Sequence, residues 1–310
     1  MVPKSLPRGA SMVGLAALGV AVMAAIVKWA SAAFSIEFLL SVRMTAGMAM
    51  FLAARRLYFP ELSLATAKPR LQVINGTVYV AAMYCLYSSL SSTPLPKALL
   101  LFNLAPILAT AWNHFFRKIR QPWPAWLGTA LGLAGVVLVM VPASERIGGV
   151  SWLALASGVL MSVVLVTSNM LGPTEPKERI SFYVVLCGVV ISLGAMSVVG
   201  VHYPAWQHSL FPPRDWASPF FEDTGLLAAL LSLGLLTILV PALTSGAYHY
   251  ASMGELGPFR YSGVLFAALI DWLVWSQFPA WNDVLAFALI TAGGALAVWG
   301  RRAYTEGFET

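Results

Sequence analysis

Long apolar stretches dominate this chain and limit what it can fold into. Ten of them hold about 20 residues each, the length that a helix rising about 1.5 Å per residue needs to cross a hydrocarbon core about 30 Å thick. Their approximate ranges are 11–33, 36–54, 73–91, 95–116, 123–141, 150–171, 180–201, 225–249, 255–276 and 282–300. The chain is 59% hydrophobic and only 10% charged, whereas soluble proteins carry about 25% charged residues. We therefore expect an all-α integral membrane protein with ten transmembrane helices.

Basic residues are distributed unevenly between the two sides of such a membrane protein. If the ten spans alternate in direction, only Arg146 and Arg214 lie in the loops of one side. The opposite side carries Lys4, Arg8, Arg55, Arg56, Lys68, Arg70, Arg117, Lys118, Arg120, Lys177, Arg179, Arg301 and Arg302. Cytoplasmic loops are enriched in Lys and Arg. We therefore predict a multi-pass protein of the cytoplasmic (inner) membrane with both termini in the cytoplasm, and we connect the net charge of +6 with the bilayer rather than with nucleic acid.

An internal repeat relates the two halves of the chain. A shift of 158 residues places 106–139 over 264–297 without a gap. The residues that then match are Trp123 with Trp281, Asn113 with Asp271, and Ala134–Gly135 with Ala292–Gly293. With five spans in each half, the second copy enters the membrane from the other side. The sequence thus predicts two inverted five-helix repeats, residues 1–145 and 146–310, an architecture that transporters use for alternating access around a midplane site.

Four segments resemble the EamA-type members of the drug/metabolite transporter (DMT) superfamily. They are RMTAGMAMFLAARR (43–56), KALLLFNLAPILATAWNHFF (97–116), WLGTALGLAGVVLVM (126–140) and GPFRYSGVLFAALIDWLVW (257–275). The resemblance covers nearly the whole chain, as two EamA-like halves. It implies a ten-helix bundle that moves a small organic metabolite, commonly outward. The family often has Glu at the ends of the fourth and ninth spans, where this chain has Lys118 or Ile119 and Gln277.

Two charged residues interrupt the ninth span. A charge at a helix centre costs about 2.5–3.5 kcal/mol on insertion scales, so water, a partner or a ligand has to compensate it. Arg260 and Asp271 are eleven residues apart, about 16 Å along a helix, and do not pair with each other. Arg260 either extends to the membrane surface (snorkelling) or binds a carboxylate or phosphate of a substrate with two hydrogen bonds from its guanidinium. Asp271 either forms an ion pair with another helix or takes part in proton coupling.

Other polar side chains within the spans are candidates for substrate contact. Arg43 lies about seven residues into the second span and either binds substrate or forms a structural ion pair. Lys28 either snorkels, forms a salt bridge with Glu37, or binds substrate. The candidate substrate-binding residues are Arg260, Tyr261, Asn103, Tyr79, Tyr84, Tyr87, Tyr248, Arg43 and Lys28, and the candidates for coupling or an ion pair are Asp271 and Glu37. In the eighth span, one helix face carries Thr237, Pro241, Ser245 and Tyr248.

The residues leave three functions open. The first is a secondary transporter, an exporter or exchanger of a small anionic or zwitterionic metabolite. The second is a carrier of an amphipathic or cationic metabolite or drug, which would use Asp271, Glu37 and aromatic faces. The third is a lipid-modifying membrane enzyme, but the sequence has no His-x-x-His and no phosphate-binding Gly loop. We expect a transporter rather than an enzyme, with no cofactor or metal; a homodimer is possible.

Overall fold

The regular elements of the described chain are all helices. The structure, a computed structural model, describes residues 5–31, 34–91, 93–115, 118, 123–140, 150–200, 224–247, 249–250, 256, 258–277 and 281–306. Its helices are α1 (Leu6–Ala30), α2 (Ile36–Tyr58), α3 (Pro69–Leu90), α4 (Leu95–Phe102), α5 (Ala105–Phe115), α6 (Trp123–Met140), α7 (Val150–Leu171), α8 (Lys177–Gly200), α10 (Thr224–Ala247), the 3-10 helix η3 (Pro258–Tyr261), α12 (Ser262–Trp275) and α13 (Trp281–Glu306). Among these described elements, six are long and apolar enough to cross a membrane, namely α1, α2, α3, α7, α8 and α10. The chain is an integral membrane protein whose described residues form helices and their connections.

Two of the predicted spans are not continuous α-helices. The fourth divides into α4 and α5, with a break at Asn103 and Leu104. Pro106 accounts for this break, because it has no N–H to donate and its ring clashes with the carbonyl four residues earlier, that of Phe102. The expectation of one helix over 95–116 is therefore wrong. The ninth span contains the 3-10 helix η3, and α12 begins at Ser262, which lies 158 residues after Leu104.

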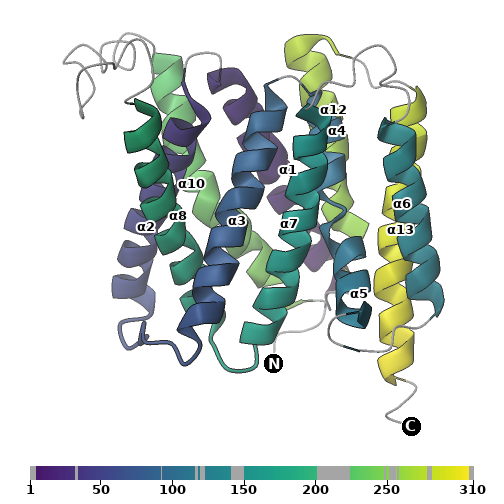
Figure 1. Cartoon of the computed structure of the whole chain (residues 1–310), viewed down its shortest axis with the longest axis horizontal. Coiled ribbons are helices and arrows are strands. Elements are labelled where there is room, and N and C mark those ends of the chain that lie inside the picture. Colours follow the sequence, from purple (N-terminus) through teal and green to yellow (C-terminus); the bar gives the residue numbers. More distant parts are fainter. Residues whose placement is uncertain are drawn as a thin grey trace.

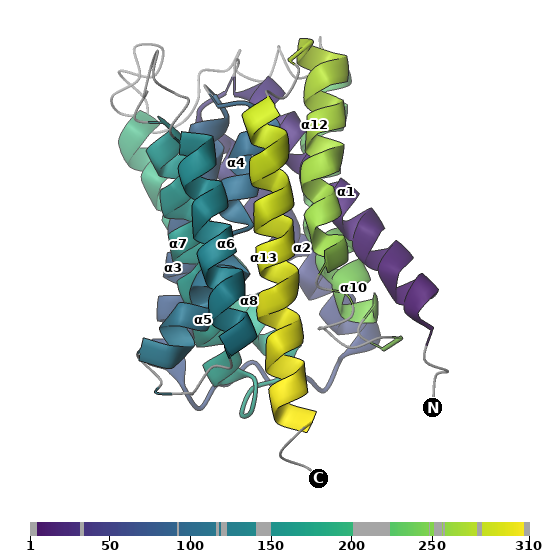
Figure 2. The ribbon, with the colours of Figure 1, turned by 90° about the vertical axis from the view of Figure 1, so that its right-hand side faces the viewer.

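The helices pack in pairs that connect the early and late parts of the chain. α3 contacts α7 and α8, α1 contacts α10 and α12, and α2 contacts α8 and α10. α6 and α13 lie along each other at the right-hand side of Figure 1, the side that faces the viewer in Figure 2. The main buried core lies where α1 to α4 meet α10 and α12.

The contact between α6 and α13 is reciprocal. A side-chain carbon on Gly135 would lie 2.6 Å from Ile290 Cγ1 and 3.0 Å from the Ala286 carbonyl oxygen. A side-chain carbon on Gly293 would lie 2.5 Å from the Gly128 carbonyl oxygen and 2.8 Å from the Gly132 nitrogen. The glycines differ by 158 in number, and so do their partners, Gly128 from Ala286 and Gly132 from Ile290. The numbers rise along one helix as they fall along the other, so the two helices are antiparallel.

The two ends of the bundle carry different connections. Both chain ends lie at one end in Figure 1, together with the α2–α3 connection (59–68) and the α7–α8 turn (172–176). We call this end the terminal face. The other end, the opposite face, carries the end of α1 and the start of α4. Residues near these two ends and in the middle of the bundle form three polar clusters.

Candidate functional site

The central cluster surrounds Arg43, which lies two turns into α2 and is only 7% exposed. Its Nη1 donates to Tyr87 Oη at 2.5 Å, and its Nη2 donates to Tyr79 Oη at 3.0 Å. Its Nε donates to Thr237 Oγ1 at 3.4 Å, and Met83 Sδ lies 3.3 Å from Nη1. The guanidinium carbon is 5.6 Å from the centre of the Tyr87 ring. Arg43 is thus held by neutral groups of α3 and α10.

Local sequence explains why these groups meet. Tyr79, Met83 and Tyr87 recur every four residues, which places them on one face of α3. Gly47, one turn after Arg43, allows α10 to approach closely, because a side-chain carbon there would lie 2.9 Å from Thr237 Cγ2. Pro241 lies inside α10 and leaves the Thr237 carbonyl without its usual helical donor.

The charge of Arg43 has no counter-charge in the described part of the chain. The ion pairs there are Lys28–Asp271, Lys97–Asp283 and Arg179–Glu175. A buried charge that lacks a partner of opposite sign costs several kcal/mol. A guanidinium offers a planar fork of donors that matches a carboxylate or phosphate. A carboxylate or phosphate beside Arg43 would therefore compensate its charge.

The second cluster, at the opposite face, is centred on Asp271. Lys28 Nζ donates to Asp271 Oδ1 at 2.6 Å, and Asp271 Oδ2 accepts the Leu95 N–H at 3.1 Å. The side chains of Lys28 and Asp271 are 11% and 1% exposed, and Nζ also lies 4.5 Å from the centre of the Trp275 ring. Asp271 thus forms an interhelix ion pair in the structure, one of the two roles expected for it. The pair joins α1, α4 and α12.

Glu37 has a different partner from the one expected. It is 9% exposed, and its Oε1 accepts a hydrogen bond from Tyr84 Oη at 2.9 Å. The expected salt bridge between Lys28 and Glu37 is therefore wrong, because each side chain is bound elsewhere. Glu37 is a buried carboxylate whose described partner is neutral.

The remaining candidates lie around the helix breaks. Tyr261 is 5% exposed and packs against Gly294 of α13, and its Oη has no hydrogen-bond partner among the described residues. Asn103 Nδ2 donates to the Leu99 carbonyl at 2.9 Å, which completes the end of α4. Arg260 is half-buried and makes no hydrogen bond or ion pair within the described ranges. None of the three side chains of Tyr261, Asn103 and Arg260 is hydrogen-bonded to Arg43. Tyr248 lies outside the described residues.

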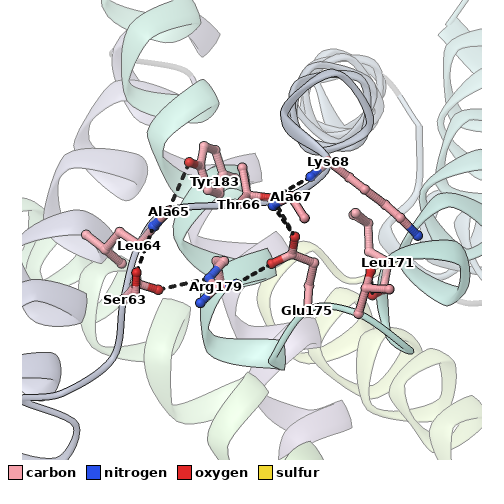
Figure 3. Close-up of polar contacts among 11 residues, drawn as sticks. Ser63, Leu64, Ala65, Thr66, Ala67, Lys68, Leu171, Glu175, Arg179 and Tyr183 are labelled. Atoms are coloured by element: carbon pink, nitrogen blue, oxygen red, sulfur yellow. Dashed lines mark hydrogen bonds and ion pairs between the residues drawn. The ribbon is translucent and has the colours of Figure 1, made fainter.

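The third cluster lies at the terminal face and surrounds the buried side chain of Glu175 (Figure 3). Its Oε1 accepts hydrogen bonds from Thr66 Oγ1 at 2.6 Å and from the Ala67 N–H at 2.9 Å. Its Oε2 accepts a hydrogen bond from Arg179 Nη1 at 2.6 Å. Arg179 Nε donates to the Ser63 carbonyl at 2.9 Å. The hydrogen bonds from Thr66 and then Arg179 hold the pKa of the Glu175 carboxyl below its usual range. Sequence reasoning missed this cluster, although a Glu and an Arg four residues apart were a usable signal.

Comparison with known proteins gives consistent results. Residues 7–141 match the EamA-like transporter family. The pseudopaline exporter CntI of Pseudomonas aeruginosa is 24% identical over 96% of each chain. The S-adenosylmethionine uptake transporter of Rickettsia bellii is 20% identical over 72% of this chain and 70% of its own length. The riboflavin transporter of Rhizobium johnstonii is 25% identical over 77% of this chain and 70% of its own length.

A solved structure shares the fold. It is a protein crystal structure with a TM-score of 0.62 and 22% identity, matched over 95% of this chain and 98% of that one. The named relatives are transporters of small metabolites, and the helices are those of a multi-pass membrane protein. The first half of the chain is thus similar to the EamA-like transporter family, and nearly the whole chain is similar in sequence to the exporter CntI.

Proposed function

We propose that this chain is a secondary transporter that exports or exchanges a small anionic or zwitterionic organic metabolite by alternating access. The observation that carries the substrate class is Arg43, a buried cation whose described partners are all neutral. A substrate carboxylate or phosphate would supply the missing negative charge through charge-assisted hydrogen bonds. The family and its named relatives are transporters, which favours this function over a lipid-modifying enzyme.

The proposed architecture is ten spans in two inverted repeats, residues 1–145 and 146–310. Both helix breaks support it, since the helices that follow them, α5 and α12, begin at Ala105 and Ser262, within one residue of the 158-residue shift. The reciprocal glycine contact between α6 and α13 follows the same shift. Helix order supports it as well, because the contact of α3 with α7 has its counterpart in the contact of α10 with α1.

We propose that the protein lies in the cytoplasmic (inner) membrane and that its terminal face is on the cytoplasmic side. The support is the positive-inside rule. Described basic residues at this face include Arg55, Arg56, Lys68, Arg70, Lys177 and Arg179. At the opposite face, by contrast, Lys28 and Lys97 are bound to carboxylates.

Within the proposed site, Arg43 binds the anionic group, and Tyr79 and Tyr87 orient it. Arg260 and Tyr261 are a proposed second contact. Glu37 would bind the ammonium of a zwitterion, since it lies six residues from Arg43 on α2, about 9 Å along the axis. The same buried carboxylate is the observation that favours the second candidate function, a carrier of amphipathic or cationic compounds.

The test is the thermal stability of the purified full-length protein with a panel of carboxylates, phosphates, amino acids and organic cations. A ligand at 100 times its Kd stabilises the folded state by about 2.7 kcal/mol. We expect an anionic or zwitterionic compound to raise the Tm of the wild type but not of Arg43→Gln. Arg56→Gln, which changes an exposed Arg of the same helix, is the control and should keep the response.

Two results would contradict the proposal. If the compound stabilises wild type and Arg43→Gln equally, Arg43 does not bind it, and Arg260→Ala is then the variant to measure. If only cations stabilise the protein and Glu37→Gln removes their effect, the second candidate function is correct. Exchange of the same radiolabelled compound across proteoliposomes tests transport itself.

A further inference from the structure

One face of α3 carries a stripe that runs from the terminal face to the candidate site. Its residues are Gln72, Asn75, Tyr79, Met83 and Tyr87, and their spacings of three, four, four and four residues keep them on one side of a helix. The last three contact Arg43. Gln72 and Asn75 are 0% exposed and lie one to two turns nearer the terminal face. We call these five residues the α3 stripe.

The two amides of the stripe are buried without being fully satisfied. Neither amide atom of Gln72 has a hydrogen-bond partner among the described residues, and neither does Asn75 Nδ2. Asn75 Oδ1 accepts Thr167 Oγ1 at 2.6 Å and Ser168 Oγ at 3.1 Å, both from α7. Burying an unpaired amide costs free energy that hydration would recover. These positions suit a surface that is covered in one state and wet in another.

The Glu175 cluster closes the terminal end of this interface. The segment 63–67 leads directly into α3, and Glu175 follows α7 (Figure 3). Its carboxylate therefore binds the entry of one helix to the exit of the other, through Thr66 and Ala67. Lys68 Nζ adds a contact of 3.4 Å to the Met170 carbonyl. The contacts cross from the first proposed repeat to the second.

We propose that the α3 stripe is the cytoplasmic access path to Arg43 and that the Glu175 cluster is the gate that closes it. This inference rests on the proposed transport function. When the contacts of Glu175 with Thr66 and Ala67 break, α3 and α7 separate at the terminal face, water reaches Gln72 and Asn75, and an anion can approach Arg43. At the opposite face, the Lys28–Asp271 pair keeps α1, α4 and α12 together.

The gate can be tested without knowing the substrate. Gln72→Cys is made in full-length protein in which Cys85 and Cys187 are replaced by Ala. Its alkylation by a charged, membrane-impermeant thiol reagent is followed in inside-out membrane vesicles. We expect slow reaction with Glu175 present and a rate at least about tenfold higher with Glu175→Gln, a tenfold change being about 1.4 kcal/mol of opening. Thr66→Val removes one hydrogen bond and should give a smaller increase.

Arg70→Cys is the matched control. Arg70 lies two residues before Gln72 and is exposed at the end of α3 nearest the terminal face, so its reactivity should not depend on Glu175. Equal rates for Gln72→Cys with and without Glu175→Gln or Thr66→Val would overturn the gate. If Glu175→Gln does not fold, Thr66→Val alone decides the question.

Failure of the gate and failure of the proposed function are distinguishable. Neither Glu175 nor Thr66 contacts Arg43 in the described structure, so both variants should keep the rise in Tm that an anionic ligand causes. A normal ligand response with unchanged alkylation rates rejects the gate alone. Faster alkylation with a ligand response that does not depend on Arg43 rejects the anion site alone.

Discussion

Breaking the Lys28–Asp271 pair tests how the opposite face is held together. At 2.6 Å and an effective dielectric constant of about 20, the attraction is about 6 kcal/mol, but desolvation of both charges offsets much of it. The measurable cost comes from leaving one charge buried alone, about 3–5 kcal/mol. We expect about 3 kcal/mol for Asp271→Asn, because Lys28 lies two residues from the end of α1 and can extend toward the surface. Lys28→Met leaves an anion that is 1% exposed, so its cost lies at the upper end of that range.

The double variant gives the decisive comparison. Lys28→Met with Asp271→Asn removes both charges and keeps an acceptor for the Leu95 N–H, so its loss should fall to about 1 kcal/mol, less than either single variant. The assay is thermal unfolding of purified protein, where about 2–3 °C per kcal/mol predicts a fall of about 6–9 °C for Asp271→Asn. Lys97→Met, in a pair 27% and 10% exposed with 3.2 Å between its atoms, should cost about 1 kcal/mol or less. Small single losses that simply add in the double variant would refute the reasoning.

Three further predictions use the same thermal assay. Gly293→Ala should lower the free energy of unfolding by about 1–3 kcal/mol through overpacking. The loss should exceed that of Gly135→Ala, because the new methyl group meets the backbone of Gly128 and Gly132 rather than mainly the side chain of Ile290. Gly194→Ala is the control: nothing lies within 4 Å of the added carbon, so the stability should stay unchanged or rise by up to about 1 kcal/mol. Since the folded-state pKa of Glu175 is lowered, its contribution is complete above the usual Glu pKa and is lost only as pH falls through the lowered value. The Tm gap between wild type and Glu175→Gln should therefore stay constant near neutral pH and close only below the usual Glu range; a gap that closes at neutral pH would contradict this. Tyr261→Phe should leave the Tm unchanged or raise it, because the Tyr261 hydroxyl is buried without a described partner. Tyr79→Phe, by contrast, should lower the free energy of unfolding by about 1 kcal/mol, because it removes a hydrogen bond to Arg43. A clear fall in the Tm of Tyr261→Phe would show that its hydroxyl has a partner.

The apolar spans were predictable because membrane insertion depends on local composition. The shift of 158 residues was also visible in the sequence, and Trp123 and Trp281, which it matches, begin α6 and α13. The break after Phe102 was predictable from Pro106 as well, but the strong apolar run around it was interpreted as one helix.

The partners of the polar side chains were less predictable. Arg43, Tyr79, Tyr87 and Thr237 were all identified as polar residues within spans, but their meeting depends on which faces of α2, α3 and α10 turn toward one another. That is decided by packing over the whole bundle. The wrong partner for Lys28 has the same cause, since Glu37 is near in sequence while Asp271 is 243 residues away. Glu175 lies between spans, so its charge does not interrupt an apolar stretch and is not conspicuous in the sequence.

The glycine contact between α6 and α13 also affects how the chain assembles. Each helix offers the other the same patch, in which a glycine fits beside two residues spaced four apart. Such a surface is self-complementary, as in a two-fold symmetric dimer. The two halves of the chain therefore carry a means of recognising each other that does not require a covalent connection between them. Co-expressed as separate polypeptides, residues 1–145 and 146–310 should associate through this pair, and a bulky residue at position 293 should prevent it.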